Sequence, residues 1–285
     1  MDLKPPLKIS DQINLLESRG MVINEKKAAR SFLERHNYYQ LNAYFHKFYL
    51  PTDVFVKGTT FDRIVEIYNT DAWFRHQIFA VIEPIEVHLR CRIAYHLATK
   101  YGSDVLYRFN EFADVRSWKE NLCKITEEIF RNGKNPVVKH HVDNYKSVFP
   151  IWVAAEFISL GTLSMLYSNL KQEDSSSIAN DYFGIPDEYL KSWLRSLTVL
   201  RNICAHSGYL YRREIPKAPT RFPNMNWGPS VNSNKLFVFL YVIKRLSTIE
   251  DWQVFFTSIV EYDKKKCCLN SKDYGFPENW IEILT

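Results

Sequence analysis

Apolar residues recur every three or four positions along most of the chain, a spacing typical of amphipathic α-helices. The longest such run extends from Phe61 to Lys100, and its repeat predicts one buried stripe. The stripe consists of Ile78, Ile82, Ile85, Leu89, Ile93 and Leu97. Pro84 lies inside the run, so we expect a kink there or the start of a new helix.

The same spacing predicts helices in the second half of the chain. A run that opens at Pro150 has its inner face at Trp152, Ala155, Ser159, Leu163, Leu166 and Leu170, with Glu156 on the same side. Gly161 in this run is expected to let a neighbouring helix approach closely. Other helices are expected at Val115–Arg131, from Pro186 to His206, at Leu236–Leu246 and at Trp252–Tyr262. Lys171–Ser177 is predicted to be a charged turn, and residues 212–234, with four prolines, a long loop.

The first 50 residues predict a small basic helical region. Ser10 can cap a helix over Gln12–Ser18, and a second helix is expected to begin at Asn24 or Glu25. The second helix carries Lys26, Lys27, Arg30 and Arg35, and the aromatic segment Asn37–Phe45 follows it. Two short basic helices joined by a turn can bind a nucleic-acid backbone. Alternatively, they only pack against the main helical bundle.

The pattern as a whole predicts an all-α fold with no internal repeat. Nine glycines are few for a sandwich, a barrel or a Gly-rich nucleotide-binding fold. We expect two parts, a basic N-terminal helical region at residues 1–50 and a helical domain at 51–285 into which the long loop is inserted.

Net charge and cysteine content restrict the possible partners and the cellular compartment only a little. The net charge of +5 permits a polyanionic partner without requiring one. Five cysteines, an odd number with no Cys-x-x-Cys pair, favour reduced thiols. The sequence contains neither an apolar run of membrane-spanning length nor a recognisable signal peptide, so we expect a cytoplasmic protein that does not bind membranes.

The candidate catalytic residues cluster at the end of the helix that follows Pro186. Its apolar stripe is Leu190, Trp193, Leu194, Leu197, Leu200 and Cys204. Arg201 projects into the middle of that stripe, where a guanidinium needs a carboxylate, a phosphate or a subunit boundary. Asn202 and His206 lie four residues apart, on a more polar face that they share with Arg195.

Charged residues on other inner stripes offer partners for this guanidinium. Glu86 and Glu156 fall on the inner sides of their helices, and Arg90 follows Glu86 by four residues, which allows the two to pair. One interpretation is a buried cluster in which a carboxylate orients Arg201. The alternative is that helix ends or loops leave some of these groups in water.

Arg201 and His206 are separated by about 140° of azimuth and about 7.5 Å of rise in a regular helix. Either the backbone turns near Ser207-Gly208, or two copies of the motif face each other across a two-fold axis. In the second arrangement a phosphodiester fits between the copies, with Arg201 stabilising negative charge and His206 moving protons. Asn202 orients His206 or binds the ribose, and no metal or cofactor is needed.

Other catalytic classes lack their patterns. His140-His141-Val142-Asp143 has no third ligand at a metal-site spacing. The chain contains no phosphate-loop signature and no Gly-x-Ser-x-Gly elbow. Cys204 lies on the apolar stripe, so we expect a packed thiol there rather than a nucleophile.

Arg201 and His206 form an Arg-x4-His motif that resembles that of HEPN domains, which are all-helical modules of many RNA-targeting toxins. The wider chain resembles the bacterial abortive-infection Abi family of the AbiD/AbiF type. The segments that carry this resemblance include Gln12–Leu16, Asn37–Leu41, Ile82–Arg90, Pro150–Trp152, Leu160–Ser164 and Trp193–His206, together with Asp71 and Glu156.

The resemblance implies a HEPN-like helical bundle that forms a homodimer and acts as a metal-independent endoribonuclease toxin in phage defence. It implies a catalytic role for Arg201, Asn202 and His206, and control by a small RNA antitoxin. Relatives continue past the motif with a basic run, which corresponds here to Gly208–Arg213. Residues expected to contact RNA are therefore Tyr209, Arg212 and Arg213, with Arg195, Lys26, Lys27 and Arg30.

Two other interpretations stay open at this point. The chain can be a non-catalytic RNA-binding or scaffold protein that uses the same basic groove. Alternatively, Arg201 is purely structural and pairs with Glu86 or Glu156.

Overall fold

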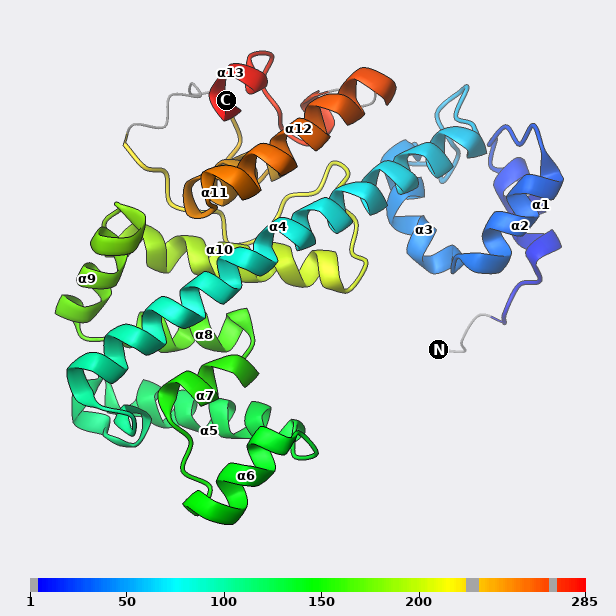
Figure 1. Cartoon of the computed structure of the whole chain (residues 1–285). Coiled ribbons are helices and arrows are strands. Elements are labelled where there is room, and N and C mark those ends of the chain that lie inside the picture. Colours follow the sequence, from blue (N-terminus) through cyan, green and yellow to red (C-terminus); the bar gives the residue numbers. More distant parts are fainter. Residues whose placement is uncertain (1–4, 224–230, 267–270) are drawn as a thin grey trace. The chain divides into compact units, whose positions relative to one another are not determined.

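The computed structural model describes residues 5–223, 231–266 and 271–285, and in these ranges the fold is all-α, as predicted (Figure 1). The α-helices are α1 (Ile9–Ser18), α2 (Lys26–Arg35), α3 (Tyr38–Phe45), α4 (Phe61–Tyr101), α5 (Val115–Arg131), α6 (Pro136–Tyr145), α7 (Ile151–Phe157), α8 (Leu160–Ser168), α9 (Gln172–Phe183), α10 (Asp187–Ala205), α11 (Leu236–Leu246), α12 (Ile249–Lys266) and α13 (Trp280–Leu284). Short 3₁₀ helices are η1 (His46–Phe48), η2 (Val105–Tyr107), η3 (Phe109–Glu111) and η4 (Ser271–Asp273).

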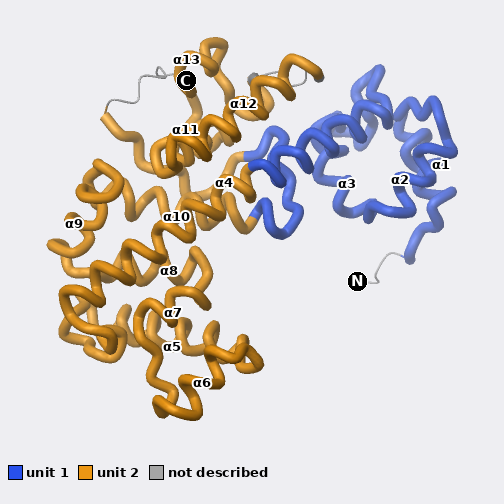
Figure 2. Tube along the Cα trace, viewed as in Figure 1, with its two compact units in different colours: residues 1–77, 203–213 blue, residues 78–202, 214–285 orange. Residues whose placement is uncertain are grey.

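The chain divides into two compact units (Figure 2). Unit 1 comprises residues 1–77 and 203–213, and unit 2 comprises residues 78–202 and 214–285. Residues of α4 and of α10 therefore belong to both units. The division of the chain after residue 50 into an N-terminal region and a helical domain stays a prediction.

Unit 1 is built on α1, α2, α3 and the start of α4. Its buried residues include Ile13, Leu16, Phe32, Leu41, Tyr44, Phe45, Phe55, Phe61 and Ile64. Lys8 rather than Ser10 occupies the N-cap position of α1, so the predicted cap is wrong. The predicted start of the second helix is confirmed, because α2 follows directly after Glu25.

Unit 2 contains the two predicted apolar stripes. All six stripe residues of α4 from Ile78 to Leu97 are buried, and so are Leu190, Trp193, Leu194, Leu197 and Leu200 of α10. The expected approach at Gly161 is also confirmed, because a Cβ there would lie 3.3 Å from Thr198 Cγ2 of α10. α5 packs against α7 and α8 in the same unit.

Pro84 does not start a new helix, because α4 continues through it without interruption. A proline inside a helix removes one backbone hydrogen bond and costs about 3 kcal/mol. Each fully buried Ile or Leu of the surrounding stripe contributes about 1.5–3 kcal/mol, so the stripe outweighs that cost.

The helix predicted from Pro150 onward is two helices. α7 ends at Phe157, Ile158 is extended, and the Ser159 hydroxyl caps α8 by accepting from the Thr162 N–H. A serine that can cap a new helix competes with continuation of the old one. The break changes the direction of the inner face, so Trp152 and Glu156 are exposed and their predicted burial is wrong.

Four helices of the described residues were not predicted, namely α3, α6, α9 and α13. α6 follows Asn135, whose side chain accepts from the Val137 N–H, and Pro136 occupies the first turn. α9 occupies the segment expected to be a turn, where Asp174 and Ser175 are buried and hydrogen-bonded. Buried polar partners from other helices stabilise α9, and its own polar sequence gives little indication of them.

Between α10 and α11 the chain is non-helical where it is described, and residues 224–230 of the predicted loop, with Pro229, lie outside the described residues. Cys91, Cys123 and Cys204 are free thiols, and Cys267 and Cys268 lie outside the described part. Over residues 5–223, 231–266 and 271–285, each helix is either too short or too polar to cross a membrane.

Candidate functional site

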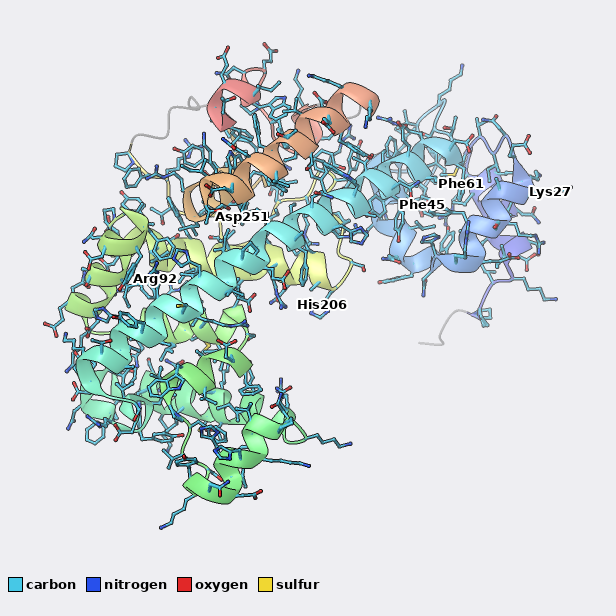
Figure 3. All side chains as sticks on the ribbon, viewed as in Figure 1. Lys27, Phe45, Phe61, Arg92, His206 and Asp251 are labelled. Carbon is cyan, nitrogen blue, oxygen red and sulfur yellow. The ribbon has the colours of Figure 1, made fainter. Side chains whose placement is uncertain are left out.

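α10 ends in a capped left-handed turn directly after His206. Ser207 has φ 55° and its N–H donates to the Cys204 carbonyl at 3.3 Å, while the Gly208 N–H donates to the Ile203 carbonyl at 2.8 Å. This pair of bonds is a Schellman cap, with His206 at the C-cap position. The predicted stop at Ser207-Gly208 is confirmed, although the left-handed residue is the serine. His206 is exposed at the end of α10 (Figure 3).

A buried carboxylate holds the backbone that follows His206. Asp71 is fully buried, and its Oδ2 accepts from the N–H groups of Leu210 at 2.6 Å and Tyr211 at 3.2 Å. The same oxygen accepts from the Tyr44 hydroxyl at 3.0 Å. Burial, followed by the Asp71 charge, raises the pKa of Tyr44, so this phenol remains a hydrogen-bond donor. The turn after His206 is thereby fixed within unit 1.

Arg75 extends this clamp. Its Nη1 donates to the Gly208 carbonyl and to the Tyr44 hydroxyl, both at 3.3 Å, and lies 3.8 Å from the Asp71 carboxylate. Asp71 and Arg75 were not among the site residues predicted from the sequence. The signal available in the sequence was a pair of opposite charges four residues apart, but the start of α4 carries other charged residues, such as Asp62, Arg63 and Glu66.

The segment 209–213 is a cluster of cations and rings. Lys47 Nζ lies 5.5 Å and Arg213 Cζ 4.8 Å from the Tyr209 ring centroid. Arg212 Cζ lies 5.1 Å from the centroid of Tyr211. Three residues expected to contact RNA, Tyr209, Arg212 and Arg213, therefore lie together in unit 1, with intramolecular cation–π contacts.

Arg201 lies in unit 2 against a buried carboxylate. Its Nε is 3.7 Å from Glu86 Oε2, its Cζ is 5.3 Å from the centroid of the Phe79 ring, and its side chain is 28% exposed. The Nε atom is buried and makes no hydrogen bond with any described residue. The predicted interaction between Arg201 and a carboxylate on an inner stripe is thus present for Glu86.

Glu86 joins two guanidinium groups. Arg90 Nη2 donates to Glu86 Oε1 at 2.5 Å and to the Ile158 carbonyl at 2.7 Å. A cleft of about 180 Å³ opens beside these groups. It is lined by Phe79, Ile82, Glu83, Glu86, Val87, Arg90 and Arg201. The formal charges of the lining balance, because Glu83 and Glu86 face Arg90 and Arg201. Glu86 is engaged by both guanidinium groups, and Arg201 keeps N–H donors that suit an anionic ligand.

The remaining predicted site residues are more exposed. Asn202 and Arg195 are exposed on α10, and neither makes a hydrogen bond or ion pair in the described part of the chain. Glu156, exposed on α7, likewise has no ion pair within the described ranges and does not accompany Glu86 beside Arg201.

The three cations of α2 that are expected to contact RNA also lie on the surface. Lys26 Nζ is 2.8 Å from Glu17, and Arg30 Nη1 is 3.9 Å from Glu34 in an i, i+4 pair. Lys27 has no carboxylate partner as far as the structure describes the chain. Exposed pairs of this kind contribute little to stability, so all three cations can still meet a polyanion.

Cys204 is buried, as predicted, and burial raises the pKa of its thiol to about 12. A thiol with this pKa is protonated at neutral pH and is therefore a poor nucleophile. Among the described residues, no group of three or more His, Cys, Asp or Glu side chains is placed to hold a metal ion.

The described part of the chain is all-α. Arg201 of α10 pairs with Glu86 of α4, and the exposed His206 follows at the end of α10. A family model described as Abi-like protein matches residues 31–212, which is more than half of the chain and includes Arg201, Asn202 and His206. The chain belongs to this family of Abi-like proteins, which relates it to abortive infection. No curated protein and no solved structure matches the chain.

Proposed function

We propose that the protein is a metal-independent endoribonuclease toxin of abortive infection, in which Arg201 and His206 act on the RNA backbone. The observation that carries the proposal is the state of Arg201, a guanidinium oriented by buried Glu86 and still exposed to a cleft. An arginine with a purely structural role is usually enclosed by its partners, whereas this one retains donors for a phosphate.

The surroundings of His206 support the same function. The imidazole is exposed at the C-cap of α10, and the backbone after it is fixed by Asp71 and Arg75. A general acid or base must be held in place and still reach its substrate. The family match, which spans the motif and Glu86, agrees with a role in defence against phage.

The reaction we propose is internal transesterification of RNA. The ribose 2′-oxygen attacks the adjacent phosphorus, the bond from phosphorus to the 5′-oxygen breaks, and the products carry a 2′,3′-cyclic phosphate and a 5′-hydroxyl. One imidazole takes the proton of the 2′-hydroxyl, and a second imidazole gives a proton to the leaving 5′-oxygen. Arg201 stabilises the additional negative charge on the phosphoryl oxygens.

Two imidazoles require two copies of the motif, so we propose that the active form is a homodimer. Asn202 orients His206 or binds the ribose. A small RNA antitoxin is the proposed inhibitor, and it uses the basic residues Lys26, Lys27, Arg30, Arg195, Arg212 and Arg213.

The test is cleavage of labelled single-stranded RNA by the purified chain in the presence of EDTA. His206→Ala and Arg201→Ala should each lower the cleavage rate by about 100-fold or more, in line with the loss of a proton-transfer group or a charge stabiliser. RNA with a 2′-deoxy sugar at the cut position should stay intact, because the nucleophile is missing.

Matched controls separate chemistry from general damage. His140→Ala removes another exposed histidine, and Arg116→Ala another exposed arginine, and both variants should cleave RNA as the wild type does. If the wild type binds RNA in a salt-dependent manner and leaves it intact, the chain is an RNA-binding or scaffold protein instead. If Arg201→Ala only lowers the melting temperature and His206→Ala changes nothing, Arg201 is structural.

A further inference from the structure

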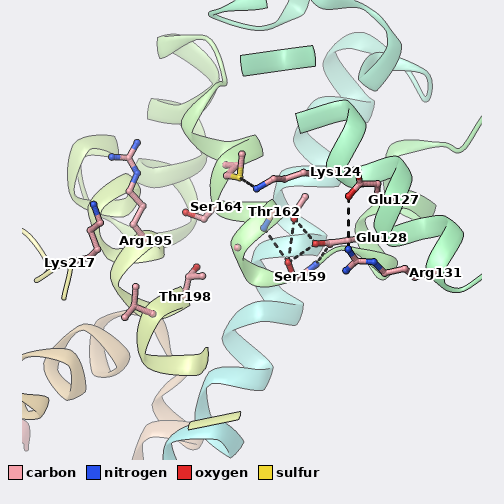
Figure 4. Close-up of a pocket in the computed structure, with 13 residues that line it drawn as sticks. Lys124, Glu127, Glu128, Arg131, Ser159, Thr162, Ser164, Arg195, Thr198 and Lys217 are labelled. Atoms are coloured by element: carbon pink, nitrogen blue, oxygen red, sulfur yellow. Dashed lines mark hydrogen bonds and ion pairs between the residues drawn. The ribbon is translucent and has the colours of Figure 1, made fainter. Parts of the chain in front are cut away.

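A second, larger cleft lies wholly in unit 2 and is separate from the Glu86 cluster (Figure 4). Its volume is about 470 Å³, within the range of about 300–1,000 Å³ that is typical of small-molecule sites. α5 forms one wall, α10 and the loop after it form the other, and the start of α8 lies between them. We call it the α5–α10 cleft.

The walls of the α5–α10 cleft carry more positive than negative charge. Its cations are Lys124 and Arg131 on the α5 side and Arg195 and Lys217 on the opposite side, and its carboxylates are Glu127 and Glu128. Clefts lined by one sign of charge focus the electrostatic potential and attract ligands of the opposite sign.

Both carboxylates are already engaged. Glu128 accepts from the Ser159 N–H at 2.7 Å and from the hydroxyls of Ser159 at 3.0 Å and Thr162 at 2.8 Å. Glu127 lies 3.9 Å from Arg131. Neither carboxylate pairs with Lys124, Arg195 or Lys217. The positive charge of these three residues is therefore not neutralised by a carboxylate of the cleft.

Those three cations, Lys124, Arg195 and Lys217, have no carboxylate partner within the described residues. Lys124 Nζ contacts the Met165 sulfur, at 3.4 Å. The Lys217 carbonyl accepts from the Ser196 hydroxyl at 2.6 Å, which holds this loop residue against α10. Three unpaired cations around one concavity repel one another, and a bound polyanion removes that repulsion.

The cleft also has an apolar part. Met165 of α8 and Val199 of α10 contribute to its lining, and the close approach at Gly161 brings these two helices together. Phosphate-binding cations next to a thioether and a branched aliphatic side chain suit a ligand with an anionic end and a flat, weakly polar end.

We infer that the α5–α10 cleft binds a nucleoside phosphate. Arg195, Lys217 and Lys124 hold the phosphate, and the base packs on Met165 and Val199. This binding does not depend on RNA cleavage at Arg201 and His206. The ligand is a free nucleotide or one nucleotide of an RNA strand, which share this chemistry.

The geometry of α10 allows the bound nucleotide to belong to an RNA strand. Arg195, Val199 and Asn202 lie on one face of the helix, since residues four and seven apart are aligned. Arg195 and Asn202 are separated by about 10.5 Å along the helix axis. A strand that reaches Asn202 can therefore continue toward the cleft along the same face.

The test measures binding to the full chain carrying His206→Ala, so that the proposed nuclease activity does not consume the probe. The probes are AMP, GMP, CMP and UMP by calorimetry, inorganic phosphate as the comparison, and a six-residue 5′-phosphorylated oligoribonucleotide by fluorescence anisotropy. At least one nucleoside phosphate or the oligonucleotide should bind more tightly than inorganic phosphate, and binding should weaken as salt is added.

Arg195→Ala and Lys217→Ala should each raise the Kd about tenfold, the effect of losing one charge-assisted contact. Lys119→Ala on α5 and Lys139→Ala on α6 remove exposed lysines that do not line the cleft, and they should leave the Kd unchanged. Binding by mononucleotides identifies a free ligand, and binding by the oligonucleotide alone identifies RNA. Absence of binding by every nucleotide probe, binding no tighter than that of phosphate, or equal binding by the cleft variants would overturn the inference.

Discussion

The Asp71 carboxylate accepts a hydrogen bond of 2.6 Å from the backbone N–H of Leu210, which joins α4 to the segment that follows His206. These residues are 139 positions apart in the chain. The same oxygen accepts from Tyr211 and Tyr44, so a single buried carboxylate satisfies three donors. This arrangement fixes the backbone beside the proposed catalytic histidine.

Asp71→Ala should lower the free energy of unfolding by about 3 kcal/mol, because it leaves buried N–H groups and the Arg75 charge without their acceptor. Urea denaturation measures this loss. Tyr44→Phe removes only one of the three donors and should cost about 1 kcal/mol. Equal stability of Asp71→Ala and wild type would contradict the clamp.

Ser207→Gly should stabilise the protein by about 0.5–1 kcal/mol, since Ser207 is in the left-handed region that glycine adopts without strain. The estimate allows for the greater freedom of glycine in the unfolded chain. Ser207→Ala is the control and should bring no gain, because alanine keeps the Cβ. Thermal unfolding followed by circular dichroism distinguishes the two, and a lower melting temperature for the glycine variant would argue against the left-handed turn.

Periodicity predicted the helices that carry their own apolar stripe. The stripe of α4 from Ile78 to Leu97 and the limits of α5 and α11 agree with the structure. α9 was missed because its stability depends on partners elsewhere in the chain. Asp174, for instance, is held by His96 and Lys100 of α4, and no local pattern reports such partners.

The same distinction applies to the candidate site. Arg201 in an apolar stripe required a partner, and Glu86 on a second stripe supplied it, so this pair was predictable from two periodic patterns. The same argument gave a wrong result for Glu156. The predicted helix ends at Phe157 and Ser159 caps a new one, so Glu156 does not lie on a continuous inner stripe. The Asp71 clamp binds backbone N–H groups, which have no signature in a sequence.

Glu86→Gln should lower the free energy of unfolding by about 2–3 kcal/mol, because Arg90 and Arg201 both lose the carboxylate that they share. If the proposed function holds, it should also reduce RNA cleavage, since Arg201 loses its orienting partner. Glu156→Gln is the matched control, an exposed glutamate with no ion pair in the described residues, and it should change neither property. Unfolding and RNA cleavage measured on both variants show which carboxylate orients Arg201. Loss of cleavage in Glu156→Gln alone would assign that role to Glu156.

Asp174 of α9 is a buried carboxylate whose hydrogen bonds make stability depend on pH. Burial alone would raise the pKa of Asp174, but hydrogen bonds from Lys100, His96 and Tyr101 lower it below its ordinary value. A carboxyl whose pKa is lower in the folded state contributes stability above its unfolded pKa of about 3.9, and the contribution is lost as the pH falls through the folded pKa. Asp174→Asn should therefore cost about 2 kcal/mol at pH 7, and the difference from wild type should shrink below about pH 4. Urea denaturation of both proteins at pH 7, 5 and 3 measures this, with Asp143→Asn on the exposed face of α6 as the control that should match wild type throughout. A difference that stays constant down to pH 3 would show that the Asp174 charge does not stabilise the fold.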